Sequence, residues 1–193
     1  MASRRVALAA VALVALCLLA GADAKPKGNG KSKGNKGKSP KWPDAPAGAI
    51  VAAADLSAAV NKTTDGKGYA YLVLPKGGPY KSYIMLGGAM KAVSMAHVHW
   101  MNATAKNPIR LGLFPSVTAA GTPALLNPTL TYKGSATFER AWNETDIGYW
   151  GTDIKTFLGL LKMEMLYVNV HTAANPGGEI QGTLKCKSPC MWS

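Results

Sequence analysis

The chain has 193 residues and a formal net charge of +12, and its basic residues are unevenly distributed. Residues 25–41 contain seven lysines and no acidic residue, so much of the positive charge belongs to one short segment. Residues 46–185 are enough for one domain with its own core. Nucleic acid is excluded as a partner, because the basic segment has no interleaved aromatic residues and the N-terminus predicts secretion.

Residues 1–24 have the pattern of a signal peptide. Arg4 and Arg5 precede an apolar run over residues 6–20, and Ala22-Asp23-Ala24 supplies small residues at the cleavage position. The apolar run is shorter than the roughly 20 residues that a membrane-spanning helix needs. We therefore expect a secreted, extracellular chain that starts near Lys25 and has no transmembrane segment, the alternative being an uncleaved membrane anchor.

Residues 25–45 are expected to form a disordered basic arm. Its lysines alternate with Gly, Asn, Ser and Pro, which cannot bury enough apolar surface to offset the entropy of ordering. Two interpretations remain open, a solvated spacer and an electrostatic tether to an anionic polysaccharide or another cell-surface component. The charges in question belong to Lys25, Lys27, Lys31, Lys33, Lys36, Lys38 and Lys41.

Residues 46–185 predict an all-β domain. Short apolar runs rich in aromatic and branched side chains alternate with Gly, Pro and Asn, including the turn glycines Gly77-Gly78 and Gly87-Gly88. This spacing indicates an antiparallel Greek-key sandwich or barrel of about seven or eight strands, with one short helix over residues 152–162 that Thr152 can cap. The expected strands are 49–60, which could also be helical, and 68–74, 80–86, 94–101, 109–114, 130–138, 166–171 and 179–184.

All three histidines of the chain lie in two of these strands. The two-residue period of a strand places His97 and His99 on one face, with Met95 and Met101 beyond them. The same period places His171 on one face of the later strand. If the two strands are neighbours, the three imidazoles meet in one patch.

The segments around these histidines resemble the CHRD domain, the chordin-type domain. Residues 167–172 followed by 175–182 are similar to its closing signature, and residues 96–99 to its central motif. The resemblance covers about residues 49–184 and is weakest over 118–149, where we expect a loop particular to this chain. It implies an extracellular β domain without a settled activity. A growth-factor partner is not implied, because this chain lacks cysteine-rich modules.

The histidine pattern also shows a weaker resemblance to the Cu,Zn superoxide dismutase barrel. That family binds copper through a His-x-His strand pair and a distant Val-His strand, which His97, His99 and His171 match in part. The chain has no further histidine for a bridging ligand, and no substrate-guiding arginine can be identified. Any catalysis would be that of a copper-dependent oxidoreductase, but the sequence favours a protein without enzymatic activity.

Two interpretations of the histidines stay open. Three converging imidazoles suit copper, with zinc less favoured, and a thioether from Met95 or Met101 would favour Cu(I). Alternatively, the imidazoles satisfy backbone carbonyls under a loop. Glu179 could orient an imidazole, although an exposed salt bridge is the simpler expectation.

Modification sites agree with export from the cell. Asn61, Asn102 and Asn143 each begin an Asn-X-Thr acceptor pattern for glycosylation. Cys186 and Cys190, in the C-terminal tail of residues 186–193, are expected to form a disulfide in an oxidising compartment, the alternatives being metal binding or an intermolecular bond. The sequence thus favours a secreted binding or matrix-associated module, with copper binding or redox chemistry as the alternative.

Overall fold

The computed structural model describes residues 44–116 and 123–192. The signal peptide and nearly all of the basic arm lie outside the described residues, so both stay predictions. Within the described ranges, no helix is long and apolar enough to cross a membrane.

The described chain is mainly antiparallel β-structure, which confirms the predicted fold class. Side chains of successive strand residues point to opposite faces, and one face of each strand supplies branched and aromatic side chains to a common core. Each fully buried Leu, Ile or Val there contributes roughly 1.5–3 kcal/mol. The strands are β1 (Ile50–Ala58), β2 (Lys67–Leu74), β3 (Tyr80–Trp100), β4 (Ile109–Phe114), β5 (Leu130–Trp142), β6 (Leu166–Thr172), β7 (Ile180–Thr183) and β8 (Lys185–Cys186).

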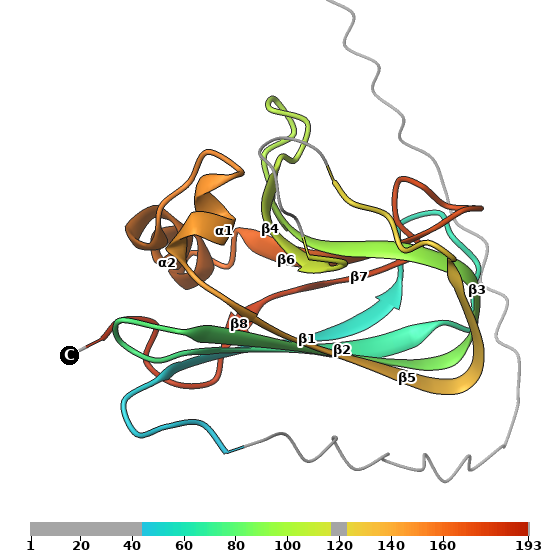
Figure 1. Cartoon of the computed structure of the whole chain (residues 1–193). Helices are drawn as coiled ribbons and strands as arrows, with labels where there is room; N and C mark the ends of the chain where they lie inside the picture. The colour runs from blue at the N-terminus through green and yellow to red at the C-terminus, as the bar shows by residue number, and fades with distance from the viewer. Residues whose placement is uncertain (1–43, 117–122, 193) are drawn as a thin grey trace, which may run out of the picture. The chain divides into compact units, whose positions relative to one another are not determined.

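The strands close into a barrel because β3 belongs to two layers, a first layer with β1, β2 and β5 and a second layer with β4, β6 and β7 (Figure 1). The first half of β3 pairs with β2 and β5, and its second half pairs with β6 and β4. The ring is completed by β1, which pairs with β2 along most of its length and with β7 at its end.

The continuity of β3 corrects the prediction of separate strands over 80–86 and 94–101. Gly87 and Gly88, expected in a turn, lie inside one strand of 21 residues. The strand bends instead, since Gly88 and Ala92 have positive φ angles of 84° and 51° and the register shifts between Met90 and Val93. The glycines that predicted a turn therefore lie at a bend within β3, where pairing with the neighbouring strands keeps the chain extended.

Two short helices cover one end of the barrel in the part of the chain that the structure describes. The predicted helix is α2 (Ile154–Lys162), and its N-terminus is capped by Asp153, not by Thr152. The second helix, α1 (Glu144–Gly148), was not predicted; Asn143 caps it in a capping box with Asp146. The region 118–149, where a loop particular to this chain was expected around the predicted strand 130–138, contains β5, which extends that strand to Trp142, and α1; residues 117–122 lie outside the described ranges.

The residues after β8 pack against the first layer. Trp192 donates its indole N–H to the carbonyl of Leu74, and the Ser188 hydroxyl accepts from the Val51 amide. Cys186 and Cys190 form a disulfide, as expected, with their Cα atoms 5.8 Å apart.

Candidate metal centre

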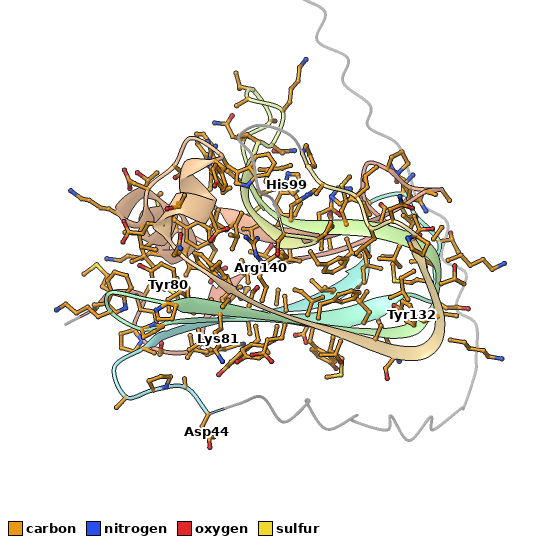
Figure 2. The ribbon with its side chains drawn as sticks, in the orientation of Figure 1. Asp44, Tyr80, Lys81, His99, Tyr132 and Arg140 are labelled. Carbon is orange, nitrogen blue, oxygen red and sulfur yellow. A yellow bond between two sulfur atoms is a disulfide. The ribbon has the colours of Figure 1, made fainter. Side chains whose placement is uncertain are left out.

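The three histidines lie together on the outer face of the second layer. In the β3–β6 register His97 is opposite Asn169, His99 is opposite Tyr167, and Met95 is opposite His171. The intervening Ala96, Val98, Val168 and Val170 enter the core, as the two-residue period requires. Figure 2 shows His99 on the side of this layer that faces away from the barrel interior.

The imidazoles are close enough to share one ion. Ring centroids are 5.2 Å apart for His97 and His171, and 5.8 Å for each pair that includes His99. One nitrogen from each ring lies within 4.8 Å of the other two. Nitrogens bound to one metal at about 2.0–2.1 Å are about 3.3–3.6 Å apart, so small ring rotations bring the three together. The cluster can therefore hold a metal ion.

Backbone carbonyls fix the tautomer of two rings. His99 Nδ1 lies 2.8 Å from the Asn107 carbonyl oxygen, and His171 Nδ1 lies 2.8 Å from that of Pro176. A carbonyl can only accept, so each Nδ1 carries the proton and each Nε2 keeps a free lone pair. The predicted hydrogen bonding to carbonyls and the predicted metal site are thus compatible, because they use opposite nitrogens of the same rings.

Three buried ring nitrogens have no hydrogen-bond partner. They are His97 Nδ1, His99 Nε2 and His171 Nε2, one from each ring. Burial of an unpartnered polar atom is costly. Among the described residues ten side-chain atoms are in this state, and the three histidine nitrogens differ from the others in belonging to one cluster that could hold a metal. A metal ion would satisfy all three at once.

Burial keeps the imidazoles neutral. Burial, together with the neighbouring His171 and His99, lowers the pKa of His97 to about 3. Burial also lowers the pKa of His99 to about 4, against the opposing effect of the Asn107 carbonyl. The pKa of His171 is lowered by burial too, while the Pro176 carbonyl opposes this. Neutral imidazole is the form that binds metals.

The two candidate methionines lie in different surroundings. Met95 is in register with His171 and so shares the histidine face. Met101 follows the end of β3 and lines a groove of about 590 Å³ along β6 and β7. Tyr167 and Asn107 also line this groove, and Tyr167 stacks on His99 with ring centroids 5.3 Å apart. The groove therefore borders the histidine cluster.

Glu179 belongs to a separate polar cluster, contrary to both expectations for it. Its side chain is buried and makes no ion pair within the described residues; it accepts hydrogen bonds from Thr64 and Thr172 hydroxyls at 2.7 and 2.6 Å and from the Asn175 amide at 3.2 Å. Burial raises its pKa, but these three hydrogen bonds together lower it more. Glu179 thus joins the loop before β2 to the β6–β7 connection and does not orient an imidazole.

The three predicted glycosylation positions are spread over separate loops. Asn61 and Asn143 are exposed, and Asn102 is half-buried. Asn143 Oδ1 accepts from the Thr145 amide, and Asn102 Oδ1 accepts from the Ala105 amide. Glycosylation itself stays a prediction at each of them.

Sequence reasoning missed Trp150, which lies beside the cluster, and Arg110, which contacts Trp150. Trp150, which follows α1, has its ring centroid 6.1 Å from that of His97. Arg110, on β4, donates through Nη1 to the Trp150 carbonyl at 2.9 Å and lies over the Trp100 ring. No spacing pattern marks either residue, because a single Trp after an unpredicted helix and a single Arg in a short strand have many structural uses.

Comparison with known proteins identifies one family. The family model described as "CHRD domain" matches residues 49–184, a span that includes β1 to β7 and all three histidines. No curated protein and no solved structure matches the chain.

Proposed function

This chain belongs to the CHRD-domain family, and we propose that it acts as an extracellular module that binds one copper ion through His97, His99 and His171. The observation that carries this proposal is the set of three buried, unpartnered ring nitrogens within one small cluster. A protein without a ligand for these atoms would bear the cost of burying them with no return in stability.

Copper is favoured over zinc by the character of the donors. Nitrogen donors bind Cu(II) more tightly than Zn(II) in the general order of divalent affinities. Met95 adds a thioether on the same face of the sheet, and soft sulfur ligands favour Cu(I). Three protein ligands also leave a coordination position open, as in catalytic and redox sites rather than in closed structural ones.

The test is metal analysis of the full chain purified from a secreting host. After saturation with Cu(II) and removal of excess metal, we expect about one equivalent of copper, falling below about a tenth of an equivalent in His97→Ala and in His171→Ala. The Met95→Leu variant is the matched control, because it changes the same face and keeps all three imidazoles. It should retain Cu(II) and lose affinity mainly for Cu(I). Wild-type protein that holds less than about a tenth of an equivalent would reject the proposal.

A disulfide and two exposed glycosylation positions support the extracellular part of the proposal. The Cys186–Cys190 disulfide suits an oxidising compartment, and Asn61 and Asn143 lie at exposed positions that a glycan can reach. Chain recovered from the medium should begin at Lys25 and lose mass on treatment with a glycosidase. Retention of residues 1–24, with no change in mass, would contradict this part alone.

The basic arm is proposed as the tether of the module to an anionic polysaccharide or cell-surface component. The support is the run of seven lysines without an acidic residue in residues 25–41. Retention on an immobilised sulfated polysaccharide should fall steeply as salt rises and be lost when residues 25–41 are deleted. Equal retention after the deletion would reject the tether and leave the metal site untouched.

A further inference from the structure

The histidine cluster supplies no negative charge to a bound ion. Its three ligands are neutral imidazoles, and no carboxylate or thiol joins the group within the described residues. Glu179 accepts three hydrogen bonds elsewhere. A divalent ion at this buried position would therefore keep its full charge, and burial of an uncompensated charge is strongly unfavourable.

The ring next to His97 carries a hydrogen-bond donor that has no acceptor. The indole Nε1 of Trp150 is buried and unpartnered, and its ring lies beside His97 at a centroid distance of 6.1 Å. The Trp150 backbone is held on both sides, because its amide donates to the Ile147 carbonyl at 3.0 Å and its carbonyl accepts from Arg110 at 2.9 Å. The ring that carries this unpartnered donor thus lies beside one ring of the histidine cluster.

Arg110 adds a positive charge that no acidic residue balances. Within residues 44–116 and 123–192 it forms no ion pair, and its Nε is buried without a partner. Arg140 is a useful contrast, since its guanidinium pairs with the Asp146 carboxylate. The field around Trp150 therefore favours an anion, and this field is stronger than it would be at an exposed position.

We propose that the fourth ligand of the metal is a small monoanion, bound to the ion and accepting a hydrogen bond from the Trp150 indole N–H. This inference rests on the proposed metal site and adds the class of its exogenous ligand. The anion would offset part of the metal charge and satisfy the buried indole donor. Trp150 acts as a positioning residue for the anion, and Arg110 raises its local concentration.

Azide titration of the copper-loaded chain tests this assignment. Azide bound to Cu(II) produces a charge-transfer absorption, so its dissociation constant can be measured without any assay of activity. We expect wild-type protein to bind azide at the copper, and Trp150→Phe to bind it about tenfold or more weakly, because a hydrogen bond to a charged group is lost. Trp192→Phe is the matched control, because the Trp192 indole donates to the Leu74 carbonyl and not to the metal site. The azide affinity of this variant should equal that of wild type.

A second variant isolates the charge of Arg110. Arg110→Gln keeps an amide donor for the Trp150 carbonyl and removes the positive charge. Azide affinity should fall several-fold at low salt, with a smaller difference from wild type at high salt.

The outcomes separate the two proposals. One equivalent of copper with no azide absorption, or equal azide affinity in wild type and Trp150→Phe, would overturn the anion site and leave the metal site standing. Failure of the wild-type chain to bind copper would overturn both.

Discussion

Two buried polar clusters each include a residue at the C-terminal end of β6, and they differ in one respect. The Glu179 cluster begins at Thr172 and is complete, because both carboxylate oxygens accept hydrogen bonds from three donors. The histidine cluster begins at the preceding residue, His171, and leaves one nitrogen of each ring without a partner. Two adjacent residues of β6 thus belong to two kinds of cluster. We call the Glu179 cluster closed, because its carboxylate oxygens all have partners, and the histidine cluster open, because three of its nitrogens have none.

The difference separates structural polar groups from ligand-binding ones. The same fold that supplies Glu179 with three donors from two segments supplies His99 and His171 with carbonyl partners only at Nδ1 and leaves Nε2 of each ring without a partner. The hydrogen bonds at Nδ1 orient these two rings, as the partners of metal-binding imidazoles commonly do. The three unpartnered histidine nitrogens are the ones that a ligand from outside the chain would have to bind.

Removal of the closed cluster should have the largest effect on stability. Glu179→Ala leaves the Thr64, Thr172 and Asn175 donors without their acceptor, and we expect the free energy of unfolding at pH 7 to fall by about 3 kcal/mol. Denaturant unfolding measures this loss. Copper stoichiometry should remain that of wild type, since Glu179 contacts no imidazole in the structure.

Glu164→Ala is the control for that measurement. Glu164 is an exposed carboxylate paired with Lys185 at 3.2 Å, and its loss should cost less than about 1 kcal/mol. Equal losses in the two variants would show that the Glu179 cluster is no more important to the fold than a surface ion pair.

Much of this arrangement follows from sequence pattern alone. Alternation places His97, His99 and Met95 on one face and Val98 on the other, and the structure agrees because buried branched residues leave the strand little choice of register. The pairing of the two histidine strands was only a condition of the predicted patch, since no local pattern specifies which distant strands are neighbours.

The remaining parts could not be read from the sequence for physical reasons. Gly87-Gly88 has the composition of a turn, yet pairing of β3 with β2 and β5 on its two sides keeps it in a strand. Glu179 is charged and was expected at the surface, but three donors from distant and local segments permit its burial. Trp150 reaches His97 through a tertiary contact that only the complete fold creates.

Acid should destabilise the metal-free protein because the buried His97 is harder to protonate in the folded chain than in the unfolded chain. The pKa of His97 is about 3 in the folded chain, against about 6.5 when unfolded, so the unfolded chain binds the proton first as the pH falls. The contribution of His97 to stability is therefore greatest above about pH 6.5 and declines between there and about pH 3. The contribution of His97 amounts to about 2 kcal/mol between pH 6.5 and 5.

Unfolding of wild type and His97→Gln in a chelator, as a function of pH, measures that contribution. The variant lacks the titrating group, so its stability should decline less over this range, and the two curves should run parallel above pH 7.5. Parallel curves from pH 7.5 down to pH 5 would mean that His97 becomes protonated in the folded chain as easily as in the unfolded one.

The smallest expected effect gives the sharpest contrast between the clusters. His97→Leu removes a buried ring whose Nδ1 has no partner, so the variant loses no hydrogen bond through that atom and no longer buries an unsatisfied one. At pH 7.5 without metal, we expect the free energy of unfolding to change by less than about 1 kcal/mol in either direction. Val98→Ala is the matched control on the opposite face of the same strand, where a cavity in the core should cost about 2 kcal/mol.

Adding copper should reverse the order of stability of His97→Leu and Val98→Ala. Copper at a hundredfold excess over its dissociation constant stabilises a protein by about 2.7 kcal/mol, and Val98→Ala keeps the ligands needed for that gain while His97→Leu does not. If His97→Leu instead costs as much as Val98→Ala without metal, then His97 stabilises the fold as a packed core residue does, and its unpartnered nitrogen is no sign of a ligand. A small cost without metal, combined with the loss of the copper-dependent gain, identifies a residue retained for binding.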